Sequence, residues 1–225
     1  MKATFLFVIF FMLSVTGCTI DNYEMPELTL SGRIVDSETS KLVESGGNNA
    51  GSIIRLYEGD ATQPVTCRTY PDGTFSNTRV FPGSYSYEPE GPFTPVSSTR
   101  ESIEIKNNTA VEIQVIPHVR VSTELIEVTA TSAKVKLTYQ KVNMGQVLAM
   151  IGVVWSTFPN PNTSTFAGGA ILQDNVASQN PASGEKVYTL TNLKPKTKYY
   201  LRGLARTNNT GNYYNYNTQF EIQTQ

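Results

Sequence analysis

The feature that most constrains the fold is a series of short segments in which apolar and polar residues alternate, each ending at a turn signal. Leu28–Val35 (LTLSGRIV) alternates at the two-residue period of a half-buried strand. Pro71-Asp72-Gly73 is a tight-turn signal, because proline presets φ, aspartate accepts a local hydrogen bond and glycine adopts positive φ. The chain has 16 glycines and 12 prolines, and no segment carries a long apolar stripe at helical spacing. The sequence therefore predicts an all-β protein.

The predicted strands form two series of similar length, separated at Ile116-Pro117-His118-Val119. Strands at this spacing are typical of a β-sandwich of about 100 residues. We therefore expect two consecutive β-sandwich domains, 27–117 and 118–225, each folding around its own core. The strands expected in the first are 28–35, 52–57, 64–70, 74–81, 84–88, 102–105 and 110–116, with 90–95 irregular. Those expected in the second are 122–128, 134–139, 147–155, 170–173, 186–190, 199–207 and 218–224.

The N-terminus has the pattern of a secretory signal. Lys2 supplies a positive charge, Phe5–Leu13 is almost uninterrupted apolar sequence, and small residues lead to Cys18. An apolar stretch this short cannot span a bilayer, which takes about 20 residues. The four residues that end at Cys18 (VTGC) resemble the bacterial lipobox, whose cysteine is diacylated and becomes the new N-terminus. We therefore expect 1–17 to be a cleaved signal peptide and 18–26 a lipidated tether that holds the protein on the membrane.

Charge and cysteine content argue against a nucleic-acid-binding protein and against a protein stabilised by disulfides. Without the signal peptide the chain carries 17 basic and 19 acidic side chains, a net charge of −2. Nucleic acid is not an expected partner, because it requires a clustered basic face. With Cys18 acylated, Cys67 is the only thiol left, so no internal disulfide is possible. Stability must therefore come from apolar burial.

A motif in the second half resembles the fibronectin type III sandwich. Leu193, Pro195, Thr197 and Tyr199 stand at alternate positions, as they do in that family. The tyrosine of such a corner donates its hydroxyl to nearby backbone and fixes the turn between two sheets. The resemblance implies that Tyr199 is the structural corner residue and that Trp155 is the core aromatic of this sandwich.

The first half resembles the carboxypeptidase-regulatory, prealbumin-like sandwich. The matching pieces are Ser31–Asp36, Pro71–Phe75 and Phe81–Tyr85, and the match is interrupted by a longer polar loop between Lys41 and Asn49. The two-domain layout is similar to a family of Bacteroidales lipoproteins of unknown function, of DUF3823 type. That resemblance implies a role beside outer-membrane receptors of the starch-utilisation type.

Catalysis has little support in the sequence. His118 is the only histidine, which excludes two-histidine metal sites, and its place at the domain joint favours a linker residue over a general base. Cys67 lies mid-strand, where a small buried side chain is more common than a reactive thiol. A glycosidase would need two carboxylates across a cleft, and no deep cleft is predicted. We expect no enzyme activity.

No cofactor or metal site is predicted. Four loop acids, Asp36, Glu38, Asp60 and Asp72, could contribute to a calcium site. None has the spacing of oxygen ligands found in known calcium loops, so turn and capping roles are favoured for all four.

Three tyrosines near the C-terminus form the one feature that suggests ligand binding. Tyr213, Tyr214 and Tyr216 lie in or after the loop between the last two predicted strands. Sugars stack their C–H faces on exposed aromatic rings, so this cluster is a candidate glycan-binding site. Alternation places Tyr214 and Tyr216 on one face and Tyr213 on the other. The competing interpretation is that these rings pack the sandwich.

These features favour a lipid-anchored outer-membrane protein, exposed at the cell surface, that binds a polysaccharide or oligosaccharide. It would act alone or beside an outer-membrane glycan receptor or transporter. The first alternative is a spacer or assembly subunit that contacts only other proteins, which an absence of exposed aromatics would favour. The second is an enzyme, which a cleft with paired carboxylates of raised pKa would favour.

Overall fold

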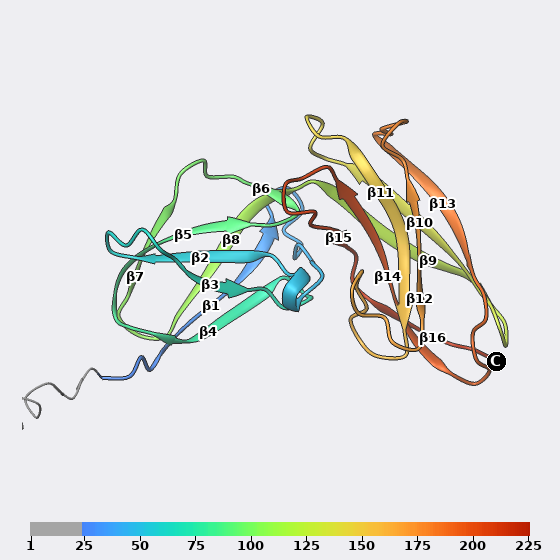
Figure 1. The fold of residues 1–225 in the computed structure, drawn as a ribbon, viewed down its shortest axis with the longest axis horizontal. Helices are drawn as coiled ribbons and strands as arrows, with labels where there is room; N and C mark the ends of the chain where they lie inside the picture. Colours follow the sequence, from blue (N-terminus) through green and yellow to red (C-terminus); the bar gives the residue numbers. More distant parts are fainter. Residues whose placement is uncertain (1–23) are drawn as a thin grey trace, which may run out of the picture.

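The computed structural model describes residues 24–225, and it places two β-sandwiches one beside the other along the long axis of the molecule (Figure 1). The expected all-β fold is confirmed, with one 3-10 turn, η2 (Asn48–Ala50), in a loop. The signal peptide 1–17 and Cys18 lie outside the described residues. Over residues 24–225, no helix combines the length and apolar character that crossing a bilayer requires.

The first sandwich consists of two four-stranded sheets, with strand orders β4-β1-β8-β6 and β3-β2-β5-β7. β1 and β8 are parallel, and the other neighbouring pairs are antiparallel. The strands are β1 (Leu28–Asp36), β2 (Ile53–Glu58), β3 (Val65–Arg68), β4 (Thr74–Val80), β5 (Gly83–Glu90), β6 (Phe93–Pro95), β7 (Glu101–Ile105) and β8 (Thr109–Pro117).

The core of the first sandwich lies between its two sheets. Most strands supply apolar side chains to it at alternate positions, as β2 does with Ile54 and Leu56, which is why the alternating pattern predicted these strands. The buried residues are Leu30, Ile34, Val43, Ile54, Leu56, Phe75, Val80, Tyr85, Tyr87, Phe93, Ile105, Ile113 and Val115.

The segment 90–95 was expected to be irregular, and that expectation is wrong. Phe93–Pro95 forms β6, which pairs with the end of β8. Pro95 is tolerated because β6 is an edge strand, where a missing N–H costs no ladder bond. Gly91 is required before it, because a Cβ there would lie 2.5 Å from both the Phe93 ring and Ser52 Oγ.

The second sandwich packs a three-stranded sheet, β13-β10-β9, against a sheet of order β12-β11-β14-β15, with β16 also paired to β14. The short strand β15 falls inside the tyrosine-rich segment that had been expected to be a loop. The strands are β9 (Val119–Val128), β10 (Ala133–Lys141), β11 (Leu148–Ser156), β12 (Ala170–Asn175), β13 (Ser183–Leu190), β14 (Lys198–Thr207), β15 (Asn215–Tyr216) and β16 (Phe220–Gln223).

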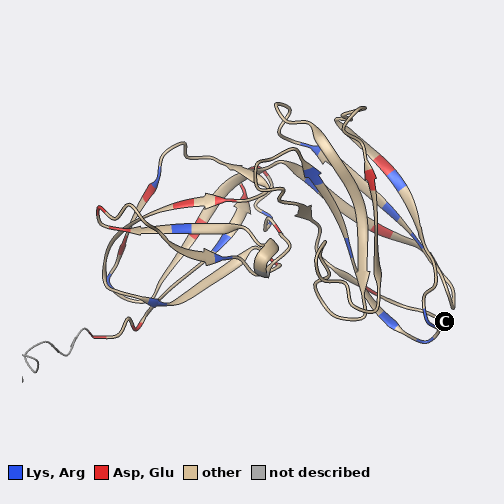
Figure 2. Ribbon diagram, in the orientation of Figure 1, with Lys and Arg blue, Asp and Glu red and all other residues tan. Residues whose placement is uncertain are grey.

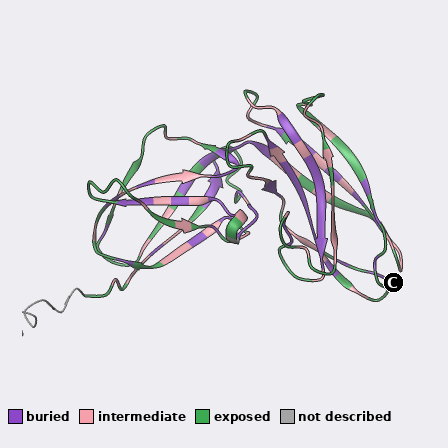
Figure 3. Ribbon diagram, viewed as in Figure 1, coloured by how far each residue is buried: buried purple, intermediate pink, exposed green. Residues whose placement is uncertain are grey.

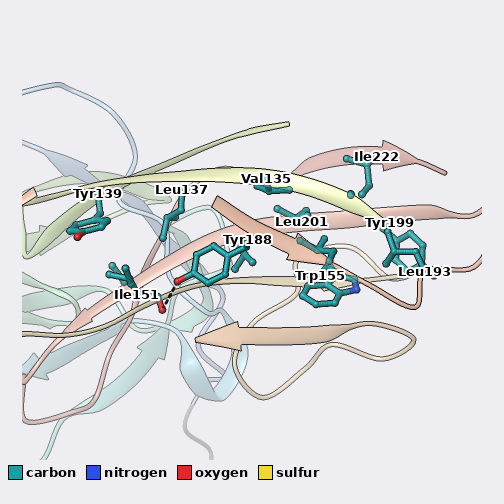
Figure 4. Packing of buried hydrophobic residues seen from close by; sticks show 14 of the residues in the cluster. Val135, Leu137, Tyr139, Ile151, Trp155, Tyr188, Leu193, Tyr199, Leu201 and Ile222 are labelled. Atoms are coloured by element: carbon teal, nitrogen blue, oxygen red, sulfur yellow. Dashed lines mark hydrogen bonds between the residues drawn. The ribbon is translucent and has the colours of Figure 1, made fainter. Parts of the chain in front are cut away.

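A separate core fills the second sandwich (Figure 4). Trp155 is 4 % exposed and packs in this core, as the sequence indicated. β11 and β14 are buried on both faces, since their opposite face carries a smaller apolar cluster of Val154, Leu204 and Tyr216 (Figure 3). This second buried face is turned toward the first sandwich, where Arg202 makes its contacts.

Tyr199 occupies the corner between the two sheets, with 2 % of its surface exposed. Its hydroxyl accepts a hydrogen bond of 2.9 Å from the Lys194 N–H. The expected corner bond, in which the tyrosine donates, is thus replaced by one in which it accepts.

Tyr199→Phe is expected to lower the free energy of unfolding by about 1–2 kcal/mol, because the Lys194 N–H loses its partner in a half-buried position. Urea denaturation monitored by tryptophan fluorescence measures the change at Trp155, the only tryptophan. Tyr200→Phe on the same strand is the control, since the Tyr200 hydroxyl makes no hydrogen bond within the part of the chain that the structure describes. Equal stability of the two variants would contradict the corner role of Tyr199.

Candidate functional site

The two sandwiches meet where β8 passes directly into β9, at Pro117 and His118 (Figure 1). His118 is 4 % exposed and is held from both sides of the junction. Its N–H donates to the Pro92 carbonyl of the first sandwich at 2.9 Å. In the second sandwich its Nδ1 lies 3.2 Å from Thr207 Oγ1, and its carbonyl accepts from the Val142 amide at 2.9 Å. His118 is therefore a packed joint residue.

Acidification is expected to destabilise the protein through His118. Burial lowers the pKa of His118 to about 4 in the folded state, whereas an unfolded histidine titrates near 6.5. Between these values the unfolded chain binds a proton that the folded chain does not. Stability is therefore highest above pH 6.5 and falls as the pH drops, by about 2.5 kcal/mol at about pH 4.5.

Thermal unfolding between about pH 7.5 and about pH 4.5 measures this loss. His118→Gln removes the titrating group, so the variant should lose less stability over the same interval than the wild type. The carboxylates of Asp36 and Asp174 do not explain a loss in this interval, because their pKa values are lowered from about 3.8. Identical pH profiles for wild type and variant would contradict the role assigned to His118.

Arg202 fastens the second sandwich to the first and has no exposed surface. From β14 its guanidinium donates to the carbonyls of Ser45 at 3.1 Å and Pro71 at 3.3 Å, and to the carboxylate of Glu44 at 2.9 Å. The guanidinium also stacks on the Tyr216 ring, 4.3 Å from its centroid. Burial lowers the pKa of Arg202, and Glu44 opposes that shift. These bonds fix the angle between the two sandwiches.

A second arginine, Arg120 at the start of β9, forms a half-buried ion pair with Asp36 at the end of β1. Its Nε and Nη2 donate to the Asp36 carboxylate at 2.7 and 3.1 Å, and Nη2 also reaches Glu38. Asp36 additionally accepts from the Glu38 amide at 3.0 Å and from Thr39 Oγ1 at 2.8 Å. Burial alone would raise the pKa of Asp36, but these hydrogen bonds outweigh it and hold the pKa below its ordinary value.

An open groove of about 790 Å³ lies between the sandwiches. Asp36, Arg120, Glu44 and Tyr216 are among the residues that line it. One wall is the segment Lys41–Glu44 together with Asp72 from the first sandwich. The other wall is formed by β9, β10 and the segment Asn215–Thr218 of the second. The volume is in the range of small-molecule sites, which is about 300–1,000 Å³. Because the arginine contacts fix both walls, the groove is preformed.

The three candidate tyrosines do not form an exposed platform. Tyr216 is 6 % exposed, lies under Arg202, and accepts a 3.2 Å hydrogen bond from the Thr163 amide, so its proposed role in stacking is wrong. The physical reason is that this face of the sheet is covered by the first sandwich and by the loop that carries Thr163. Tyr214 is half-buried beside Tyr216, with ring centroids 6.3 Å apart.

Tyr213 precedes β15 and contacts the first sandwich. It is half-buried, and its hydroxyl donates to the Glu90 carboxylate at 2.8 Å. Burial and this hydrogen bond raise the pKa of Tyr213 to about 12. Tyr213 and Tyr216 thus belong to the interface between the sandwiches. Tyr214 accepts a 3.2 Å hydrogen bond from Gln173 and lies near Arg206, within the second sandwich.

The remaining candidate residues either lie outside the groove or are already hydrogen-bonded within their own turn. Cys67 is half-buried on β3 against the first core, and burial raises the pKa of its thiol. Asp72 accepts from the amide and hydroxyl of Thr74, the turn role that its sequence predicted. Asp60 is exposed on a turn. Within residues 24–225, no three His, Cys, Asp or Glu side chains gather closely enough to hold a metal ion.

Comparison with known proteins identifies the fold. No protein-family profile matches this sequence, and no curated protein sequence does. Among solved structures, a DUF3823 family protein from Bacteroides uniformis ATCC 8492 superposes with a TM-score of 0.74 at 21% identity, covering 89% of this chain and 100% of that one. The chain has the DUF3823 fold. A second DUF3823 protein, from Parabacteroides merdae ATCC 43184, matches with a TM-score of 0.70 at 18% identity over 90% of this chain and 100% of that one.

A further structure with the same fold comes from a Bacteroides uniformis ATCC 8492 protein for which carbohydrate binding has been suggested. It matches with a TM-score of 0.71 at 19% identity, covering 88% of this chain and 99% of that one. The resemblance to DUF3823 proteins that the sequence indicated is therefore confirmed for the fold.

The groove and the two arginines that fix it were not found from the sequence. One signal was available: Leu148–Ser156 is apolar at nearly every position, and Tyr199–Ala205 is apolar apart from Arg202 and Gly203, which indicates strands buried on both faces. A charged residue inside such a strand, such as Arg202, then needs a buried partner. The sequence could not show that this partner lies in the other sandwich.

Proposed function

We propose that this protein is a lipid-anchored outer-membrane protein that binds carbohydrate in the groove between its two sandwiches, without catalysing a reaction. The observation that carries the proposal is the groove of about 790 Å³, preformed and lined by hydroxyl, amide and charged side chains from both sandwiches. Such a lining suits a ligand that is covered in hydroxyl groups. The suggested carbohydrate binding of the Bacteroides uniformis protein with the same fold supports the same class of ligand.

The proposed anchor would present the groove away from the membrane. The tether leads into β1, whose nine residues run from Leu28, at the end far from the second sandwich, to Asp36 in the groove (Figure 1). At about 3.3 Å per residue, β1 alone separates the groove from the tether by about 30 Å. That distance leaves both walls of the groove accessible to a glycan chain or to an outer-membrane receptor.

A glycan array probed with residues 19–225 tests the proposal, followed by calorimetric titration of the best oligosaccharides. Binding that is lost when Ser122→Ala and Gln140→Ala are combined would support the groove as the site. Binding that is lost only in Tyr214→Ala would instead assign the site to the tyrosine cluster. If no glycan binds, the carbohydrate proposal is wrong and the spacer or assembly role takes its place.

A further inference from the structure

The charged side chains that line the groove neutralise one another. Asp36 is paired with Arg120, and Glu44 is paired with the buried Arg202. The two lining charges left are Lys41 and Asp72, which are both exposed and opposite in sign. Over residues 24–225, basic and acidic residues are interspersed along both sandwiches (Figure 2). The groove therefore offers no unpaired arginine to an anionic ligand, because Arg120 is shared by the carboxylates of Asp36 and Glu38 and Arg202 is bound to Glu44.

Uncharged hydrogen-bonding groups remain available on the second-sandwich wall. Ser122 on β9 and Gln140 on β10 are exposed, and their side chains bond to no other described residue. Asn215 is 4 % exposed, and its Oδ1 accepts the Val119 amide at 3.0 Å, which fixes the orientation of its carboxamide. Its Nδ2 has no partner within residues 24–225 and is not fully buried, so this donor reaches the groove.

Aromatic stacking contributes little in this groove. The aromatic rings that line it belong to Tyr139 and Tyr216, which are 7 % and 6 % exposed. Neither ring can present a face to a sugar. The directional contacts in the groove are therefore left to hydroxyl and amide groups, beside apolar side chains such as Leu42 and Val121 that also line it.

We propose that the groove takes an uncharged glycan chain, whose hydroxyls are bound by Ser122, Gln140 and Asn215, and that it discriminates against uronate-containing chains. This inference rests on the proposed carbohydrate-binding function. A carboxylated sugar entering the groove would lose hydration and find both arginines already paired with protein carboxylates. The one unpaired cation of the lining, Lys41, is exposed, where an ion pair contributes little.

The test compares two hexasaccharides that share the linkage bound best on the array, one neutral and one oxidised at C6 to the uronate. Residues 19–225 are titrated with each in about 50 mM and about 300 mM NaCl. The expected result is tighter binding of the neutral chain, with an affinity that salt does not change. Preference for the uronate chain, weakened by salt, would overturn this inference and leave the carbohydrate proposal standing.

Variants locate the contacts. Ser122→Ala combined with Gln140→Ala should weaken binding of the neutral chain by roughly tenfold, since each change removes one hydrogen-bonding group. The matched control combines Ser102→Ala and Gln114→Ala, which are exposed strand residues outside the groove, and should leave binding unchanged. Equal affinities for both double variants would overturn the assignment to the groove. Failure of both hexasaccharides to bind would overturn the proposed function together with this inference.

Discussion

Arg202→Ala is expected to lower the free energy of unfolding by about 3–5 kcal/mol, because it removes one partner of a buried ion pair. The substitution leaves the Glu44 carboxylate, 12% exposed, without its cation. It also removes the donor from the carbonyls of Ser45 and Pro71, and it opens a space beside Tyr216. Urea unfolding followed by both circular dichroism and Trp155 fluorescence measures the loss.

Two further variants separate this buried contact from ordinary charge removal. Arg33→Ala breaks an ion pair with Glu112 whose side chains are 61% and 41% exposed, so it should cost less than about 1 kcal/mol. Arg202→Lys keeps the charge but cannot make three separate hydrogen bonds in one plane, so it should recover only part of the loss. If Arg202→Ala were no more destabilising than Arg33→Ala, the guanidinium would not be buried between the sandwiches.

Cys18→Ser is expected to release the protein from the membrane entirely. Each acyl methylene contributes about 0.8 kcal/mol, so the two or three chains on a lipidated cysteine hold a protein stably on a bilayer. Without them, residues 24–225 carry basic and acidic residues interspersed along both sandwiches, so charge alone is not expected to replace the anchor (Figure 2). Detergent-phase partitioning of membranes from expressing cells measures the difference.

Cys67→Ser is the matched control, because Cys67 is the other cysteine of the chain and lies against the first core. It should leave partitioning unchanged. A Cys18→Ser variant that still partitions like the wild type would show that the protein is not anchored through this residue.

The strands were predictable because their signal is local. In Leu28–Val35 or Lys134–Tyr139, alternate residues face the core, and the pattern follows from the geometry of a single strand. The exceptions are the short strands β6 and β15. Each forms only because a longer strand pairs with it, β8 in the case of β6 and β14 in the case of β15. Their sequences, rich in proline, tyrosine and asparagine, are equally compatible with loops.

The tyrosine cluster shows the limit of local inference. Alternation grouped Tyr214 with Tyr216, whose ring centroids lie 6.3 Å apart, but it could not show what each ring contacts. Whether each ring faced solvent depended on what covered it, and the covering residues are far away in the sequence. Tyr213 meets Glu90, and Tyr216 lies beneath Arg202.

The sequence by itself therefore determined the class of fold, the positions of most strands, the core role of Trp155 and the pattern of a signal followed by Cys18. The tertiary structure alone decided how the two sandwiches sit, which buried Arg202 against Glu44 and paired Arg120 with Asp36. The physical reason is that burial and pairing of a charge are set by residues brought together from distant parts of the chain. The groove is a product of that docking, so no single segment of the sequence encodes it.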